Sequence, residues 1–383
     1  MIFAHMGDCH IGSWRQPQLM ALNFQSFQVV VDRCIKEKVD FILIAGDFFD
    51  SAYPPIEVIK ETFGEFRKLK NANIPVFFIA GSHDFSASGK TFLDVLEKAG
   101  FGTNVFRSEE RDGRIILQPT IYKNIAIYGY PGKKSGMEVP EIEKIKLQDS
   151  PGLFKILMLH TAIRDAVGTL PIQAVDQEKL PEVDYTALAH LHIKYNKNRR
   201  VYCGPTFPNN SLELEELRGG SFYLIDTTTG KIERQEIKLK EVIVIDLELT
   251  DAFIGTEKVI EELKKHILKD KIIILKLRGI LERGKVSDIN FNHIEEFTRT
   301  QEAYVLLRNT TKLQAPQTEI SFELKSENIE EEIISKFREE NPNKFNELIF
   351  QLISALQLEK KEDERTQIFE DRLLSEVRKI IKI

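Results

Sequence analysis

The sequence predicts an α/β fold: a two-sheet α/β sandwich, then a small α+β domain and a C-terminal helical hairpin. The first observation behind this prediction is an alternation over about the first 200 residues, where short runs rich in Val, Ile, Leu and Phe are separated by longer amphipathic stretches. Such alternation is typical of strands and helices packed in layers. The second observation is a change of pattern after about residue 241.

Strands of the core are predicted where the apolar runs are short and are followed by turn-forming residues. They cover 2–6, 41–45, 76–80, 125–130, 154–159, 185–189 and 221–226. We expect the last of these strands to close the second sheet. Amphipathic stretches predict helices near 21–37 and 56–72. This whole region, residues 1–237, is predicted to be one domain.

A second domain is predicted over residues 238–310, where the pattern is βαβαβ. Its strands are expected at 242–249, 272–277 and 303–307, with helices near 256–268 and 288–298. Residues 311–328 are polar and contain Pro316, which predicts a linker with one short strand around 320–324.

The tail, residues 329–383, is predicted to be helical because its apolar residues recur at helical spacing. One apolar stripe is followed, across the charged turn 359–365, by a second: Phe345, Leu348, Ile349, Leu352, Ile353 and Leu356, then Ile368, Leu373, Val377 and Ile380. Two interpretations stay open. The helices pack on each other or on the body of the protein, or they form a detachable hairpin that offers an apolar face to a partner.

Composition narrows the class of protein. The chain has 383 residues, a net charge of -6 and a pI near 5.9, so bulk positive charge is not its means of holding nucleic acid. Its three cysteines show no CxxC spacing, which argues against a disulfide framework and a thiolate zinc site. No apolar run approaches the length of a membrane span. We therefore expect a cytoplasmic protein that is neither secreted nor inserted in a membrane.

Chemistry-bearing residues follow the predicted strands directly. The segments are Asp8-Cys9-His10, Gly46-Asp47 with Asp50, Gly81-Ser82-His83-Asp84, His160, and His190-Leu191-His192. In open α/β sheets, ligands bind beyond the carboxyl ends of the strands, so we expect these segments to meet in one crevice. A single histidine at a strand end is more often structural, but the joint pattern makes coincidence improbable.

These residue types predict a site for two cations. Imidazole nitrogens together with carboxylate oxygens suit manganese, iron or zinc. Asp-x-His and His-x-His place two ligands on the same side of an extended segment. Asp47, which follows Gly46, has two oxygens and can bridge two ions. Two such ions activate a water and stabilise the departing oxygen of a phosphoryl displacement.

In this order the motifs resemble the calcineurin-like metallophosphoesterase superfamily and, within it, the SbcD-type double-strand-break repair nucleases. The resemblance is specific over about residues 1–235 and only architectural in the following domain and tail. It implies a metallophosphoesterase core, a small domain that caps DNA at 238–310, and a partner-binding helical segment at 329–383.

The resemblance also implies roles for individual residues. One cation would be held by Asp8, His10, Asp47 and His192, and the other by Asp47, Ser82, His160 and His190. His83 would stabilise or protonate the leaving oxygen, and Asp84 would orient its imidazole. Asp50 would support these residues without binding a cation.

One departure from the family pattern concerns Ser82, because the usual motif is Gly-Asn-His. A hydroxyl is a shorter and weaker ligand than an amide carbonyl, so we expect weakened binding of the second cation with activity retained. Residues outside the motifs are predicted to contact DNA: Trp14, Arg15, Lys194, Arg199 and Arg200.

The function implied is a nuclease with two Mn²⁺ ions that processes DNA ends as an exonuclease and endonuclease. The resemblance further implies a homodimer, a coiled-coil SMC-type ATPase bound through residues 329–383, and a cytoplasmic, nucleoid-associated location. Two alternatives stay open. One is another calcineurin-like phosphoesterase acting on nucleotides or other small phosphodiesters, and the other is a scaffold that binds DNA ends without cutting.

Overall fold

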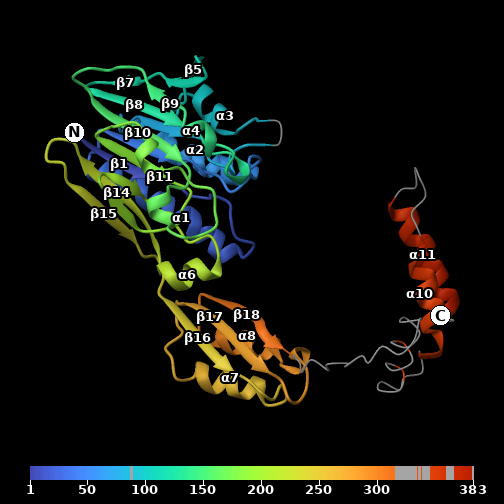
Figure 1. The fold of residues 1–383 in the computed structure, drawn as a ribbon. Helices are drawn as coiled ribbons and strands as arrows, with labels where there is room; N and C mark the ends of the chain where they lie inside the picture. Colours follow the sequence, from blue (N-terminus) through green and yellow to red (C-terminus); the bar gives the residue numbers. More distant parts are fainter. Residues whose placement is uncertain (87–88, 315–333, 335–337, 339–345, 359–365, 382–383) are drawn as a thin grey trace. The chain divides into compact units, whose positions relative to one another are not determined.

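The computed structural model describes residues 1–86, 89–314, 334, 338, 346–358 and 366–381. The chain divides into two compact units, Met1–Pro316 and Gln317–Ile383, and each is described by itself. Figure 1 shows the helices and strands of both units.

The first sheet of the large unit has the order β15-β14-β1-β2-β3-β4. Its strands are β1 (Ile2–Met6), β2 (Phe41–Ala45), β3 (Val76–Ile79), β4 (Thr103–Asn104), β14 (Gly220–Asp226) and β15 (Ile232–Ile237). The strands from β1 to β4 are parallel, and β14 pairs antiparallel with β1. Each of the first three strands is followed by one of the predicted motifs.

The prediction that strand 221–226 closes the second sheet is wrong, because β14 lies inside the first sheet between β15 and β1. This strand is apolar on both faces. Phe222 packs into the cluster under the outer helices, whereas Tyr223 and Ile225 pack into the cluster between the sheets. An apolar run predicts a strand, but the neighbouring strand is chosen by long-range packing that periodicity does not encode.

The second sheet has the order β12-β13-β11-β10-β8-β7. Its strands are β7 (Thr120–Tyr122), β8 (Ile125–Tyr130), β10 (Phe154–His160), β11 (Tyr185–Ala189), β12 (Tyr195–Lys197) and β13 (Arg200–Tyr202). The strands β8, β10, β11 and β13 are parallel. A small sheet of β5 (Ser108–Arg111), β6 (Arg114–Leu117) and β9 (Ile145–Leu147) stands beside them.

The two sheets are held together by side chains that are apolar on the facing sides. Phe3, Phe41 and Leu43 of the first sheet form one buried cluster with Ile156 and Met158 of the second. Burial of one such side chain stabilises the fold by roughly 1.5–3 kcal/mol. The two sheets therefore share one packed core, and the loops at their edge extend from it.

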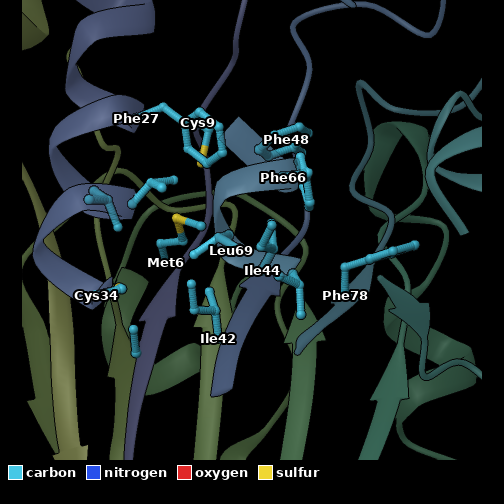
Figure 2. Packing of buried hydrophobic residues seen from close by; sticks show 14 of the residues in the cluster. Met6, Cys9, Phe27, Cys34, Ile42, Ile44, Phe48, Phe66, Leu69 and Phe78 are labelled. Atoms are coloured by element: carbon cyan, nitrogen blue, oxygen red, sulfur yellow. The ribbon is translucent and has the colours of Figure 1, made fainter. Parts of the chain in front are cut away.

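The outer face of the first sheet is covered by α1 (Pro17–Lys36), α2 (Ile56–Asn71) and α3 (Leu93–Lys98). Proline begins α1, where its missing N–H leaves no hydrogen bond unmade. Figure 2 shows how Phe27, Cys34, Phe66 and Leu69 of these helices pack on the strands. Short helical segments elsewhere in this unit are η1 (Lys134–Gly136), α4 (Val139–Ile142), α5 (Arg164–Val167), η2 (Gln177–Lys179) and α6 (Ser211–Leu217).

The small domain has a parallel sheet in the order β16-β17-β18. Its elements are β16 (Val242–Glu248), α7 (Gly255–Leu263), β17 (Ile272–Ile280), η3 (Val286–Asp288), α8 (Phe291–Thr300) and β18 (Val305–Gln314). The βαβαβ order is as predicted. Because β18 runs to Gln314, residues 311–314 of the expected linker belong to a strand.

The small domain packs directly on the core. Leu22 and Leu214 share a buried cluster with Val242 and Ile272. The Tyr304 hydroxyl donates a hydrogen bond to the carbonyl of Gln18 (3.1 Å). These contacts join the two regions within one compact unit.

In the second unit the structure describes η4 (Asn346–Leu348), α10 (Ile349–Leu356) and α11 (Thr366–Ile381). The helices α10 and α11 contact each other, and Phe350, Leu356 and Leu374 are exposed. The predicted short strand near 320–324 and the stripe residue Phe345 lie outside the described residues. Among the helices that the structure describes, none combines the length and the apolar character needed to cross a bilayer.

Candidate metal centre

The predicted motifs meet at one edge of the sandwich. In each sheet the strands that precede them are parallel, so their carboxyl ends lie together. Beyond the strands, the Asp8 amide donates to the Gly46 carbonyl and the His10 amide to the Asp47 carbonyl, both at 3.0 Å. The loops after β1 and β2 are thereby held against each other.

Several residues of these loops have a left-handed backbone that is uncommon outside glycine. The φ angles are 47° at Asp8, 42° at His10, 46° at Asp47 and 97° at His190. Each such residue is strained, and strain of this kind concentrates at functional sites. The chain therefore turns sharply at the points where the candidate ligands must face inward.

Glycines make room for the ligands. A Cβ at Gly46, where φ is 95°, would lie 2.5 Å from His160 Nδ1, and a Cβ at Gly81 would lie 2.2 Å from Asp47 Oδ1. A Cβ at Gly132 would lie 2.4 Å from His160 Cδ2. Gly46 and Gly81 belong to motifs that the sequence predicts. Gly132 was not predicted, because it follows β8 and has no distinctive neighbour in the sequence.

The first group of candidate ligands consists of Asp8, His10 and His192, whose ligand atoms all lie within 4.8 Å of one another. The Nε2 atoms of the two histidines face each other at 3.2 Å. Asp8 is fully buried, and both its oxygens accept hydrogen bonds from the His190 amide (2.9 and 3.0 Å). The carboxylate and the two imidazoles therefore converge on one point.

The second group consists of Asp47, His160 and His190, within the same limit of 4.8 Å. His160 Nδ1 lies 3.0 Å from the Ala45 carbonyl, to which it can only donate. His160 Nε2 is buried and lies 3.1 Å from Asp47 Oδ2. A buried nitrogen beside a carboxylate, held from behind by a carbonyl, is the arrangement of a metal-binding histidine.

Asp47 lies between the two groups. Its Oδ2 is 3.1 Å from His160 Nε2 and 3.8 Å from His10 Nε2. Its Oδ1 accepts a hydrogen bond from the His83 amide (2.7 Å). Burial alone would raise the pKa of Asp47, but His160 and His10 outweigh it and hold that pKa well below its usual range. Asp47 is therefore ionised and positioned to contact cations in both groups.

The same balance of forces acts on the imidazoles. Burial would lower the pKa of His160, but the charges of Asp47 and Asp8 outweigh it and raise that pKa to about 9. Burial and the neighbouring His160 lower the pKa of His190. The buried carboxylates are thus stabilised by positive charge nearby, which either protons or cations can supply. The set of imidazole and carboxylate donors fits divalent cations.

In the first group, the Nδ1 atom of each histidine, which points away from the other ligands, lies next to a carboxylate. Glu213 Oε2 is 2.9 Å from His192 Nδ1, and Asp50 Oδ1 is 3.3 Å from His10 Nδ1. A carboxylate on the far nitrogen fixes the orientation of a ligating imidazole and makes it a better donor. The contact of Glu213 with His192 is not predicted by the sequence. The spacing of Asn210 and Glu213 predicts the start of α6, where the Asn210 side chain accepts from the Glu213 amide, but not a contact with His192.

His83 is the exposed member of the site, with 48% of its side chain accessible. Its Nδ1 lies 3.0 Å from the Asp50 carbonyl and 3.9 Å from Asp50 Oδ1. A carbonyl can only accept, so Nδ1 carries a proton in this geometry. For its other nitrogen, Nε2, no hydrogen bond or ion pair is found within the part of the chain that the structure describes.

The orienting role predicted for Asp84 is wrong, because its oxygens face elsewhere. They accept hydrogen bonds from the amides of Phe48, Phe49 and Gly81, at 3.2, 3.0 and 2.9 Å. Burial and the charge of Asp47 raise the pKa of Asp84 to about 6, although the three amides oppose this. Asp84 therefore ties the loop after β2 to the loop after β3, and Asp50 is the residue that faces His83.

Ser82 donates a hydrogen bond from its hydroxyl to Asp47 Oδ2 (3.3 Å). The side chain thus lies at the second group, where the sequence predicted a ligand. Its contact in this structure is with a carboxylate that cations would also use.

The calcineurin-like phosphoesterase family matches residues 1–194. This range contains every candidate ligand from Asp8 to His192, and Glu213 lies outside it. The chain belongs to this family. Within a calcineurin-like phosphoesterase, the two groups around Asp47 are able to hold divalent cations.

Relatives of this phosphoesterase include proteins named DNA double-strand break repair protein Mre11. That of Methanosarcina mazei is 27% identical over 79% of this chain, and that of Archaeoglobus fulgidus is 25% identical over 98% of it. The chain spans 48% of the first relative and 85% of the second. The uncharacterized metallophosphoesterase YhaO of Bacillus subtilis is 25% identical to this chain. The match covers 63% of this chain and 61% of the length of YhaO.

The residues predicted to contact DNA are placed as follows. The Trp14 indole donates to the Pro208 carbonyl (2.9 Å) and packs on the cluster between the core and the small domain. Arg15, Lys194 and Arg199 are exposed. Arg200 is partly buried and donates to the Gln177 carbonyl (3.4 Å). Trp14 thus has a structural role in this phosphoesterase, whereas the three exposed cations are available to a ligand.

Proposed function

We propose that this chain is a metal-dependent DNA nuclease that processes double-strand breaks. The observation that carries the proposal is the position of Asp47, whose Oδ2 faces an imidazole of each group of candidate ligands. An ionised carboxylate shared by two groups is what a two-cation phosphodiesterase requires. DNA is proposed as the substrate because the names of several relatives refer to DNA break repair.

The first cation would be held by Asp8, His10, Asp47 and His192, and the second by Asp47, His160, His190 and Ser82. Two divalent cations at this position would activate a water and stabilise the departing oxygen. The mixture of imidazole and carboxylate favours Mn²⁺ over Mg²⁺.

His83 is proposed to donate a proton to the leaving oxygen. Its exposure leaves one nitrogen free to meet a substrate, while the Asp50 carbonyl and carboxylate hold the other. Asp50 therefore has a positioning role, and Glu213 has the same role for His192.

The remaining parts of the proposal concern partners. Residues 238–310 would cap bound DNA, and residues 329–383 would bind an SMC-type coiled-coil ATPase. The exposed apolar residues Phe350, Leu356 and Leu374 of α10 and α11 suit such a helical partner. With a net charge of -6, the chain would rely on a partner for much of its hold on DNA. A homodimer and a nucleoid-associated, cytoplasmic location complete the proposal.

Two alternatives make different predictions. A phosphoesterase for nucleotides or other small phosphodiesters would hydrolyse a generic phosphodiester but leave DNA intact. A scaffold that binds DNA ends without cutting would be inactive on both substrates. The proposed nuclease hydrolyses both.

The test is a comparison of the full chain with His83→Ala in Mn²⁺, using end-labelled single-stranded and duplex DNA together with a chromogenic phosphodiester. We expect the substitution to lower the rate of DNA cleavage about 10²–10⁴-fold, the usual contribution of a general acid. Because His83 is exposed, the melting temperature should not change. Equal DNA cleavage by both proteins would contradict the role of His83, and no cleavage by either would favour an alternative.

A further inference from the structure

A cleft lies beside the metal centre at the exposed imidazole of His83. Its volume is about 590 Å³, and its wall includes Asp50, Tyr53, His83 and Lys134. Ligand sites for small molecules have roughly 300–1,000 Å³. The wall comes from the loops after β2, β3 and β8, each of which also contributes a residue next to the ligands. A ligand in this cleft would therefore reach the candidate catalytic histidine.

Tyr53 is the most exposed aromatic residue of the cleft, with a relative exposure of 73%. A single exposed aromatic is common on protein surfaces, so its position matters more than its exposure. Phe85 lines the same cleft, but it packs against the core cluster. Tyr53 thus offers a ring face to a flat ligand bound next to His83.

Lys134 provides positive charge in the same cleft. The preceding residue, Lys133, is paired with Glu141. Lys134 is exposed and forms no ion pair with any part of the chain that the structure describes. The one carboxylate in the cleft, that of Asp50, is already 3.3 Å from His10 Nδ1 and 3.9 Å from His83 Nδ1. The free charge of the cleft therefore favours an anion.

We propose that this cleft binds one unpaired nucleotide of a DNA end, with its base stacked on Tyr53 and its phosphate paired with Lys134. The proposal rests on the nuclease function proposed above. A nucleotide has the flat ring and the anionic group that these two residues match. Within a duplex each base is covered by its neighbours, so Tyr53 can stack only on a base that has left the helix. Unpaired or frayed ends are therefore the preferred substrates.

The test pairs a change in the protein with a change in the DNA. Single-stranded oligonucleotides would carry a normal base or an abasic tetrahydrofuran next to the mapped cleavage position, and KM and kcat would be measured in Mn²⁺. For the normal oligonucleotide, we expect Tyr53→Ala to raise KM about tenfold, the size of one lost base–aromatic stack. For the abasic oligonucleotide, the same substitution should have almost no effect, and Tyr53→Phe should behave as wild type on both.

Lys134 is tested by its own substitution. We expect Lys134→Ala to raise KM equally for the normal and the abasic oligonucleotide, because a phosphate contact does not depend on the base. The matched control is Lys146→Ala, which removes an exposed cation of β9 that does not line the cleft and should leave KM unchanged.

The possible outcomes are distinct. An equal effect of Tyr53→Ala on both oligonucleotides, or none on either, would overturn the stacking proposal while leaving the nuclease function intact. Failure of the wild-type protein to cut either oligonucleotide would overturn the nuclease proposal and this inference with it. A KM for forked duplexes no lower than that for blunt duplexes would also contradict the requirement for an unpaired nucleotide.

Discussion

The two groups of candidate ligands differ in how they are supported. In the first group, His192 and His10 each have a carboxylate at the far nitrogen, from Glu213 and Asp50. In the second, His160 is held by the backbone carbonyl of Ala45 and is almost completely buried. Carboxylate support adds negative charge, whereas a carbonyl only fixes orientation. Two groups with similar ligands can therefore differ in cation affinity, and we expect the first group to bind more tightly.

The largest effect is expected at Asp47, because it belongs to both groups. Asp47→Asn removes the charge that both cations would share, and we expect both affinities and the rate of hydrolysis to fall more than about 100-fold, since loss of an outer partner alone costs 10–100-fold. Mn²⁺ titration followed by electron paramagnetic resonance would measure both affinities. Loss of affinity at only one site would show that Asp47 is not shared.

A smaller and selective effect is expected for Glu213. We expect Glu213→Gln to lower the affinity of the tighter site about 10–100-fold, because the amide no longer supports the imidazole of His192 with charge. The weaker site should keep its affinity. Glu215 is a matched control on the same helix, since it pairs with Lys276 of the small domain instead of a ligand. If Glu213→Gln changed both sites equally, the assignment of the tighter site to the first group would be wrong.

A substitution at Ser82 is expected to raise cation affinity at the weaker site instead of lowering it. Ser82→Asn supplies the amide oxygen that is usual in the family motif, and we expect it to raise the affinity of the weaker site about tenfold, or by about 1.4 kcal/mol. The dependence of hydrolysis on Mn²⁺ concentration should shift to lower concentrations. An unchanged dependence would show that position 82 does not contact a cation.

Cation binding to the second group is also expected to depend on pH. Without a cation, the pKa of His160 is raised to about 9, above its ordinary value of 6.5, so the ring holds a proton at pH 7. Stability from this proton is complete below pH 6.5 and is lost as pH rises through 9. A cation must displace the proton, so affinity of the second group should rise about tenfold for each pH unit up to that value.

Calorimetry of Mn²⁺ binding at pH 7 in buffers of different ionisation enthalpy measures this proton release directly. We expect about one proton to be released at the weaker site. Binding without proton release would contradict the protonated state of His160.

Much of the site could be predicted from the sequence, because the ligands follow strands that are visible as short apolar runs. The turn from β1 to Asp8 and His10, or from β11 to His190 and His192, is local in the chain. Glu213 could not be predicted in this way, since it reaches His192 from a helix that has its own local explanation. Gly132 is similar, because only the position of His160 reveals why no side chain fits there.

The layered α/β fold and the candidate metal ligands at its strand ends are predictable from the amino-acid sequence alone. Periodicity and turn residues are local properties, and they set the strands and the direction of the side chains that follow them. Three features are visible only in the folded protein: β14 lies in the first sheet, Asp84 ties two loops together, and Asp50 faces His83. These features depend on contacts between segments that are distant in the chain. The packing energy of such contacts cannot be derived from the sequence of either segment alone.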